Sequence, residues 1–208
     1  MARGGPRVWF AGGGTGGHLF PALAVAELLN KDRPDVRIGF LGGRRGLETR
    51  LVPAAGFPLR TLPMAGLKGA GLVRRAGAAA LAAVATVRCV GAFVAARPAL
   101  VVGVGGYASG PAVLAAIATG VRTALLEQNH YPGATNRWLA RFAGRICVPS
   151  EAARERLGGR GVVTGNPVRA AFTAIGPPPG GPLPTLLVFG GSRGARSINR
   201  AVASALPG

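Results

Sequence analysis

The stretch Arg7–Val25 reads RVWFAGGGTGGHLFPALAV and contains the three parts of a strand–turn–helix unit. Arg7–Ala11 is apolar after its first residue, which predicts a short buried strand. Gly12–Gly17 allow a tight turn, and a helix is predicted over about Phe20–Asn30. Pro21 suits the first turn of that helix, where its missing N–H has no partner to lose. Units of this kind, repeated along a chain, indicate a parallel sheet.

The same alternation continues with short glycine turns. We therefore expect an α/β fold, a Rossmann-like doubly wound parallel sheet. Further strands are predicted at Val36–Leu41, Pro58–Pro63, Ala99–Val104, Arg122–Leu126, Arg145–Val148 and Gly161–Thr164, and further helices at Arg44–Ala55, Thr135–Phe142, Glu151–Arg156 and after Pro111.

A segment rich in proline and glycine divides the chain near its carboxyl end. After it the pattern restarts, with a strand predicted at Thr185–Phe189 and a helix from about Arg196. This organisation predicts a second domain of the same kind, cut short. The expected parts are a first domain over residues 1–173, a linker over residues 174–184, and the first strand and helix of a truncated second domain over residues 185–208.

The charge of the chain is strongly positive, with 25 basic against 7 acidic residues and a net charge of +18. This invites a polyanionic partner, such as nucleic acid, anionic lipid or a phosphorylated substrate. However, all the basic residues except Lys31 and Lys68 are arginines, so a drift in composition explains much of the excess equally well. Cys89 and Cys147 match neither a disulfide scaffold nor a metal site, which favours a reduced, cytoplasmic setting.

The segment Ala76–Ala96 is long and apolar enough to suggest a membrane span. Alanine contributes little to insertion, and Arg88 near the centre costs about 2.5–3.5 kcal/mol. We therefore expect a surface or half-buried helix. We expect no signal peptide at the amino terminus, because the apolar run Val8–Ala11 is short and leads into glycines.

Three strand–glycine–helix junctions are candidate phosphate sites: Gly12–Gly17, Gly103–Gly110 and Gly190–Gly194. Each places bare N–H groups at the positive end of a helix, and in a parallel sheet such loops share one edge. They are therefore expected to converge on one ligand.

Two rival functions follow from the same features. Gly12, Gly14 and Gly17 satisfy a dinucleotide fingerprint, but the second strand ends in Arg44 and Arg45 rather than in an acid, so this alternative is an NADP-dependent oxidoreductase. A basic nucleic-acid-binding module would need arginines beside stacking aromatics. The aromatics near the glycine loops are instead expected in the core, which argues against a nucleic-acid partner; they are Trp9, Phe10, Phe20, Phe40 and Phe189.

Two ionisable residues at the predicted carboxyl edge are candidate catalytic groups. His18 ends the first glycine loop and suits a general base or a charge partner for phosphate; as an alternative, it caps the following helix. Glu127 ends a strand, and its alternative role is a structural acid that accepts loop N–H groups. No pair or cluster of acids, cysteines and histidines has a spacing that suits a metal, and no cofactor is expected.

Six ordered blocks, which cover essentially the whole chain, resemble the MurG-type glycosyltransferases. They are Gly13-Gly14-Thr15-Gly16-Gly17-His18 followed by Phe20–Ala24, Gly66-Leu67-Lys68-Gly69, Gly105–Pro111, Glu127-Gln128-Asn129 with Pro132, Gly133 and Asn136, Gly165–Arg169, and Gly190–Ala195.

The resemblance implies a two-domain, metal-independent, inverting enzyme of the glycosyltransferase B type. Its donor would be UDP-N-acetylglucosamine. Its acceptor would be undecaprenyl-pyrophosphoryl-N-acetylmuramyl pentapeptide, whose 4-hydroxyl attacks the sugar during peptidoglycan synthesis, a process tied to cell shape and division. Because this family's second domain supplies further donor contacts, the chain alone is expected to be inactive.

By position in the family pattern, each predicted site residue receives a role. The donor would contact Thr15, Gly16, Gly17, Asn129, Arg169 and Ser192. The acceptor pyrophosphate would contact Gly13, Gly14, His18, Gly105, Gly106, Tyr107 and Ser109, and the catalytic candidates remain His18 and Glu127.

A lipid-linked acceptor implies a peripheral enzyme on the cytoplasmic face of the plasma membrane. The expected membrane face is the stretch Gly66–Ala96, where basic and apolar residues share one element, as suits an anionic bilayer. Its residues are Lys68, Arg74, Arg75 and Arg88 beside Leu67, Leu72, Val73 and Phe93. An ordinary core helix with incidental arginines is the alternative.

Overall fold

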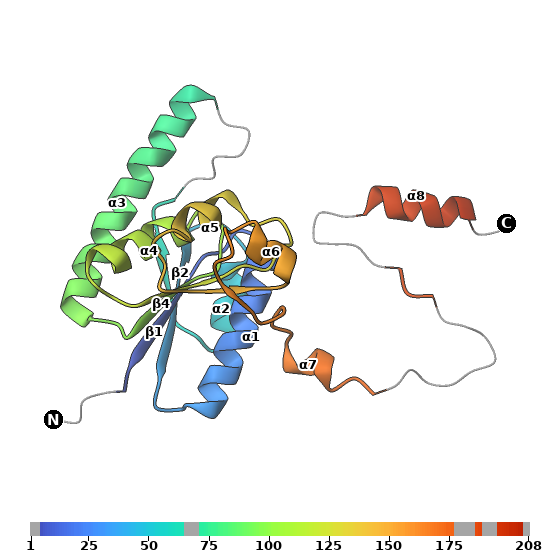
Figure 1. Ribbon diagram of the computed structural model, residues 1–208, viewed down its shortest axis with the longest axis horizontal. Coiled ribbons are helices and arrows are strands. Elements are labelled where there is room, and N and C mark those ends of the chain that lie inside the picture. Colours follow the sequence, from blue (N-terminus) through green and yellow to red (C-terminus); the bar gives the residue numbers. More distant parts are fainter. Residues whose placement is uncertain (1–4, 65–70, 177–185, 189–194, 206–208) are drawn as a thin grey trace. The chain divides into compact units, whose positions relative to one another are not determined.

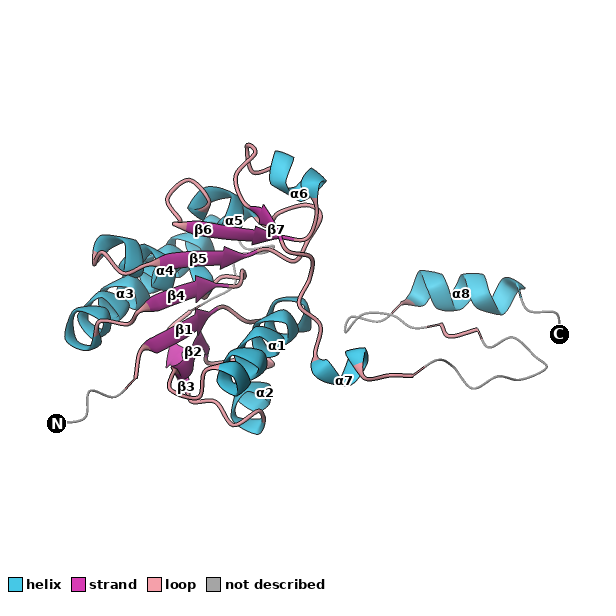
Figure 2. Ribbon diagram, turned by 60° about the horizontal axis from the view of Figure 1, so that its bottom comes forward, coloured by secondary structure: helices cyan, strands magenta, loops and turns pink. Residues whose placement is uncertain are grey.

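The computed structural model describes residues 5–64, 71–176, 186–188 and 195–205. Its strands form one parallel sheet, which lies between two layers of helices (Figures 1 and 2). The order across the sheet is β3-β2-β1-β4-β5-β6-β7. The strands are β1 (Arg7–Ala11), β2 (Arg37–Gly43), β3 (Leu59–Leu62), β4 (Leu100–Gly103), β5 (Thr123–Leu126), β6 (Arg145–Val148) and β7 (Val162–Val163).

Helices alternate with these strands, as the doubly wound pattern predicts. The helices are α1 (Gly16–Asp32), α2 (Glu48–Ala54), α3 (Leu72–Ala96), α4 (Ser109–Ala118), α5 (Ala134–Leu139), α6 (Glu151–Glu155), α7 (Ala170–Thr173) and α8 (Arg196–Ala205). Figure 2 shows α1 and α2 on one face of the sheet and α3, α4 and α5 on the other. The predicted fold class is confirmed.

The winding direction reverses at β1. The chain first adds β2 and β3 on one side, and then crosses over to β4 on the other, with Ala11 beside Gly103 in the parallel register. In open α/β sheets, a crevice opens at the carboxyl ends of the strands where the order reverses. The loops that follow β1 and β4 therefore border the natural ligand position.

Apolar residues on both faces of the sheet build two cores. On one face, Trp9 and Leu41 pack with residues of α3, α4 and α5. On the other, Phe10 and Phe40 stack with ring centroids 5.3 Å apart and pack against α1 and α2. Phe20, predicted as core, is instead 42% exposed because it lies on the outer side of α1.

Three predicted elements differ from the structure. Helix α1 begins at Gly16, directly after the extended residue Thr15, so Pro21 lies inside the helix rather than in its first turn. Helix α2 begins only at Glu48, since residues 44–47 still belong to the turn after β2. A strand was predicted at Thr185–Phe189, but the described residues 186–188 of this range form no strand. A strand forms only when its backbone groups find hydrogen-bond partners in a neighbouring strand.

Helix α3 is a surface helix, as predicted. Ala78, Ala85, Cys89 and Phe93 form one buried stripe that packs against the sheet and α4. Ala76–Ala96 is long and apolar enough to cross a membrane, and only 22% of its most apolar 18-residue stretch is buried in this fold. Phe93 was expected on the membrane face, but it is 2% exposed and belongs to the core.

The chain divides into two units, Met1–Thr173 and Ala174–Gly208. The second unit contains α8, which begins at Arg196 as predicted. Ile198 and Val202 lie four residues apart and therefore share one face of α8.

Candidate active site

Three loops meet at the carboxyl edge of the sheet. We call residues 12–15 after β1 the first loop, residues 104–108 after β4 the second loop, and residues 127–133 after β5 the third loop. The amide of Val104 donates to the carbonyl of Ala11 over 2.9 Å. Gly106 has a φ of 76°, and a Cβ there would lie 2.6 Å from the carbonyl oxygen of Gly13. A side chain at Gly106 would therefore push the first two loops apart.

The side chain of Gln128 connects the third loop to the others. Its Nε2 donates to the carbonyl of Val104 over 3.0 Å and to that of Leu126 over 3.1 Å. Its Oε1 lies 3.2 Å from Nδ1 of His18. One amide therefore joins the ends of β4 and β5 to the first turn of α1.

These contacts determine which nitrogen of His18 carries the proton in the neutral ring. Both partners of the Gln128 amide nitrogen are carbonyl oxygens, so that nitrogen must be the donor and Oε1 must face His18. An amide oxygen only accepts, which makes Nδ1 of His18 the donor. Nε2 of His18 is then the nitrogen with the free lone pair, as a general base requires. This contact joins the His18 ring to Gln128 and gives no support to the alternative role of His18 as a helix cap.

Glu127 is a buried acceptor for the third loop. Its side chain is 1% exposed, and Oε1 accepts from the backbone N–H and from Nδ2 of Asn129, each over 2.8 Å. Oε2 accepts from the amide of Gly133 and from Nδ2 of Asn136, each over 3.0 Å. With both oxygens engaged, Glu127 fits the alternative of a structural acid better than a catalytic role.

Glu48 performs a similar task for the first loop, which the sequence analysis did not foresee. It is 1% exposed, and its carboxylate accepts from the amide of Gly14 over 2.9 Å and from that of Gly43 over 3.0 Å. The carboxylate also fills the space beside Gly13, where a Cβ would lie 2.6 Å from Cδ of Glu48. The amide of Gly14, expected to bind pyrophosphate, is therefore already used inside the protein.

Tyr107 packs against the two segments whose amides donate to Glu48. Its hydroxyl donates to the carbonyl of Arg45 over 3.3 Å, and its ring lies beside Gly14 and Gly43. Burial, and after it the charge of Glu48, raise the pKa of Tyr107. The phenol therefore remains a neutral hydrogen-bonding group at physiological pH.

The remaining predicted acceptor residues divide between the loop surface and the interior. Gly105 faces His18, because a Cβ there would lie 2.9 Å from Nδ1 of that ring. Ser109 is fully buried, with its hydroxyl near Gly103, and does not reach the loop surface.

The predicted donor residues are only partly brought together. Thr15 lies in extended conformation before α1, and its side chain makes no capping bond to the helix. Gly16 is buried against Phe20, whereas Gly17 is exposed, and a Cβ there would lie 3.9 Å from Oγ1 of Thr15. The first N–H groups of α1 therefore offer an anion site beside Thr15.

Of the two further donor predictions, Arg169 lies apart from this point. Arg169 forms an ion pair of 3.8 Å with Glu27, which is about 13 Å along α1 from His18 at 1.5 Å per residue. Asn129 is held by Glu127. Ser192 lies outside the described residues.

A pocket of about 740 Å³ extends from the loops to the helices on the α3 side of the sheet. His18, Gly105 and Gly106 line it at the loops, and Leu114 and Trp138 are among its apolar residues. Asn136 also lines it; this side chain is 2% exposed, and its Oδ1 has no hydrogen-bond partner among the described residues. The pocket thus combines a polar region at the loops with an apolar region between helices.

Glu48, Gln128 and Asn136 are the site residues that sequence reasoning assigned no role. Gln128 and Asn136 stood within a recognised block, so their position was the available signal. For Glu48 the only signal was that acidic residues are rare in this sequence, since it is one of 7 acids in the chain. Its contact with Gly14 spans 34 residues, which no local pattern reveals.

Comparison with known proteins gives one consistent result. Residues 8–148 match the model of the glycosyltransferase family 28 N-terminal domain. The UDP-N-acetylglucosamine–N-acetylmuramyl-(pentapeptide) pyrophosphoryl-undecaprenol N-acetylglucosamine transferase of Syntrophus aciditrophicus is 45% identical over 97% of this chain and 56% of that protein. The protein of the same name from Magnetococcus marinus is 45% identical over 96% of this chain and 56% of its own length.

A solved structure agrees. The crystal structure of Acinetobacter baumannii MurG superimposes with a TM-score of 0.63 and 30% identity, over 79% of this chain and 45% of that one. The chain thus spans about half the length of the curated relatives it matches.

We expect Glu48→Gln to destabilise the protein, because the amide group replaces an acceptor of buried N–H groups. One unsatisfied buried donor costs about 1–3 kcal/mol, which is roughly 2–10 °C in Tm for a domain of this size. Thermal unfolding followed by circular dichroism measures the change. The control Glu155→Gln removes an exposed acid and should shift Tm by less than about 1 °C. If the Tm of Glu48→Gln equals that of the control, the hydrogen bonds accepted by Glu48 do not stabilise the protein.

We expect the neutral ring of His18 to carry its proton on Nδ1, and Gln128→Leu to abolish this preference. Nitrogen-15 NMR of the two histidine side chains distinguishes the tautomers. His130, whose ring contacts Ser150 and Arg156 rather than Gln128, is the internal control and should not change in the variant. A proton found on Nε2 of His18 in the unaltered protein rules out the tautomer.

Proposed function

Because the chain belongs to glycosyltransferase family 28, we propose that it is the amino-terminal part of an N-acetylglucosaminyltransferase of peptidoglycan synthesis. The donor is UDP-N-acetylglucosamine, and the acceptor is undecaprenyl-pyrophosphoryl-N-acetylmuramyl pentapeptide. The observation that carries this proposal is the 45% identity, over 97% of the chain, to a relative that bears this activity in its name.

The proposed reaction is a direct displacement. The acceptor's 4-hydroxyl oxygen forms a bond to the anomeric carbon of the donor sugar, the bond from that carbon to UDP breaks, and UDP leaves with the electron pair. The configuration inverts, because the attack comes from the face opposite the leaving group. The proton of the hydroxyl passes to Nε2 of His18, whose lone pair the contact with Gln128 leaves free. Independence from metal ions remains a prediction.

The large pocket supports the acceptor assignment. An acceptor of this class joins a charged pyrophosphate to an apolar polyprenyl chain. The pocket likewise joins His18 and the second loop to the apolar side chains of Leu114 and Trp138. We place the pyrophosphate at Gly105, Gly106 and Tyr107, and the N–H groups at the start of α1 remain for the donor phosphates. The amide of Gly14 donates to Glu48 and is therefore not available to a phosphate group. The first loop borders the site without using that N–H.

The domain organisation is part of the same proposal. Residues 1–173 form the acceptor-binding domain, residues 174–184 the linker, and residues 185–208 the start of the donor-binding domain. The face of α8 that carries Ile198 and Val202 suits a helix that packs on a sheet. Ser192 and Arg169 are proposed to meet the donor when that domain is complete.

We also propose that α3 and α5 attach the enzyme to the cytoplasmic face of the plasma membrane. Val84 and Val87 on α3 are 46% and 70% exposed, and Arg88 beside them is exposed as well. Trp138 and Phe142 form an exposed edge-to-face pair with centroids 5.6 Å apart. Such aromatics suit the boundary between water and lipid. The polyprenyl chain would then remain in the bilayer while the pyrophosphate reaches the loops.

The activity is tested with His18 variants of a full-length enzyme that carries this chain. Loss of a general base lowers kcat by roughly 10²–10⁴-fold, so we expect His18→Ala to show a fall of this size with little change in acceptor KM. His130→Ala, the matched control, should retain kcat. If His18→Ala keeps kcat within about threefold, His18 is not the base; a raised KM alone would assign it to pyrophosphate binding.

Membrane attachment is tested by sedimentation with vesicles that contain phosphatidylglycerol. Replacing Val84 and Val87 by Glu should lower the partition coefficient at least about tenfold, because two charges enter an apolar contact. The control replaces Leu28 and Val168 by Glu, at 59% and 57% exposure on other elements, and should bind like the unaltered chain. Equal losses in both double variants contradict the assigned face.

A further inference from the structure

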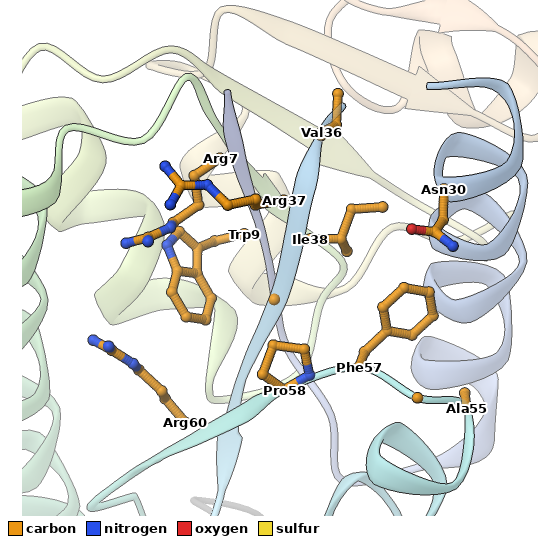
Figure 3. A pocket seen from close by; sticks show the side chains of 12 residues that line it. Arg7, Trp9, Asn30, Val36, Arg37, Ile38, Ala55, Phe57, Pro58 and Arg60 are labelled. Carbon is orange, nitrogen blue, oxygen red and sulfur yellow. The ribbon is translucent and has the colours of Figure 1, made fainter. Parts of the chain in front are cut away.

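A second pocket, of about 580 Å³, lies at the opposite edge of the sheet (Figure 3). It is lined by residues at the amino ends of β1 and β2 and by the segment that leads into β3. Strand β3 pairs with β2 only from Phe40 onward, so Arg37–Gly39 have no strand beside them on that side within the described sheet. The edge of β2 is therefore open at this point, and the pocket occupies the opening.

An indole ring forms one wall of this pocket. Trp9 lies over Gly39, where a Cβ would come within 2.6 Å of Cζ3 of the indole. The guanidinium of Arg60 covers the ring at 5.4 Å from its centroid, and Trp9 is 7% exposed. The wall is thus held in place by packing against Gly39 and by a cation–π contact with Arg60.

Positive charges surround this wall. Arg7 and Arg37 are neighbours in the register of β1 and β2, and Figure 3 shows them with Arg60 on the same side of β2 as Trp9. An adjoining hollow of about 200 Å³ shares Arg7, Trp9 and Arg60 and adds Arg88 of α3. Like charges on neighbouring strand positions repel one another, and a bound anion would remove this cost.

No acidic side chain balances these charges in the described lining of either hollow. Asp35, next to the lining residue Val36, is paired with Arg33 over 2.8 Å. The described contacts of Arg60 are with the Trp9 ring, and those of Arg37 include a hydrogen bond of 3.1 Å to the carbonyl of Gly5. An anionic ligand would therefore add a negative charge to a lining whose described side chains carry none.

We propose that this arginine pocket, lined by Arg7, Arg37 and Arg60 around Trp9, binds a small polyanion that carries phosphate groups. The planar guanidinium fork matches phosphate oxygens two at a time. The volume suits a small molecule. A nucleic acid would need aromatic faces open for stacking, whereas Arg60 covers Trp9. The pocket lies at the amino edge of the sheet, so the proposal does not depend on the transferase reaction at the carboxyl edge.

The test is fluorescence titration of the 208-residue chain with inorganic pyrophosphate at constant ionic strength. The chain has two tryptophans, so Trp138→Phe leaves Trp9 as the reporter inside the pocket. We expect a saturable change in Trp9 emission. Adding Arg7→Gln and Arg60→Gln should raise Kd at least about tenfold, because each removes a charge-assisted contact.

The control replaces Arg50 and Arg141 by Gln, two exposed arginines that line neither hollow, and removes the same charge. Its Kd should stay within about twofold of the reporter chain. Without pyrophosphate, the variant with both Arg7→Gln and Arg60→Gln should unfold cooperatively with a Tm close to that of the reporter chain, since the repulsion between Arg7 and Arg37 falls as the contact of Arg60 with Trp9 is lost; this shows that weaker binding is not loss of fold. An equal rise of Kd in the control overturns the proposal, as does a Trp9 signal that does not saturate.

Discussion

The hydrogen bonds from loop amides to two buried carboxylates hold the carboxyl edge of this sheet together. Tight glycine loops leave backbone N–H groups without partners, and a buried N–H without an acceptor is costly. Glu48 accepts such bonds from the first loop and from the end of β2, and Glu127 accepts them within the third loop. The chain has 7 acids, and two of them, Glu48 and Glu127, serve as buried acceptors for loop amides. The loops therefore depend strongly on fixed acceptors.

Hydrogen bonds of this structural kind also affect the chemistry of the proposed site. Because Glu48 takes the amide of Gly14, we assign anion binding in our proposal to the second loop and to the start of α1. Gln128, anchored by the carbonyls of Val104 and Leu126, presents its oxygen to Nδ1 of His18, which leaves the lone pair of the neutral ring on Nε2, the nitrogen that we propose as the base. Structural hydrogen bonds thus underlie both the phosphate position and the base that we propose.

The two edges of the sheet use charge in opposite ways. At the carboxyl edge the buried acidic side chains of Glu48 and Glu127 accept hydrogen bonds from backbone and side-chain amides. At the amino edge the side chains of Arg7, Arg37 and Arg60 gather around Trp9 with no acid among the described lining. The excess of arginine is therefore not spread evenly, and one part of it has a geometry suited to an anion.

The sequence by itself determined the doubly wound parallel sheet, the glycine loops at one edge and the family. Periodicity and glycine turns are local signals, and ordered blocks such as Gly105–Pro111 need no coordinates to be recognised. Only the tertiary structure decided that Glu48 braces the first loop, that Gln128 orients His18, and that Ser109 and Phe93 are buried rather than exposed. These properties depend on contacts between residues far apart in the chain, 34 positions for Gly14 with Glu48 and 110 for His18 with Gln128. Such contacts form only when the parallel register of β1, β2, β4 and β5 brings the loops to one edge. The sequence pattern specifies which face a side chain takes, but not which partner it meets there.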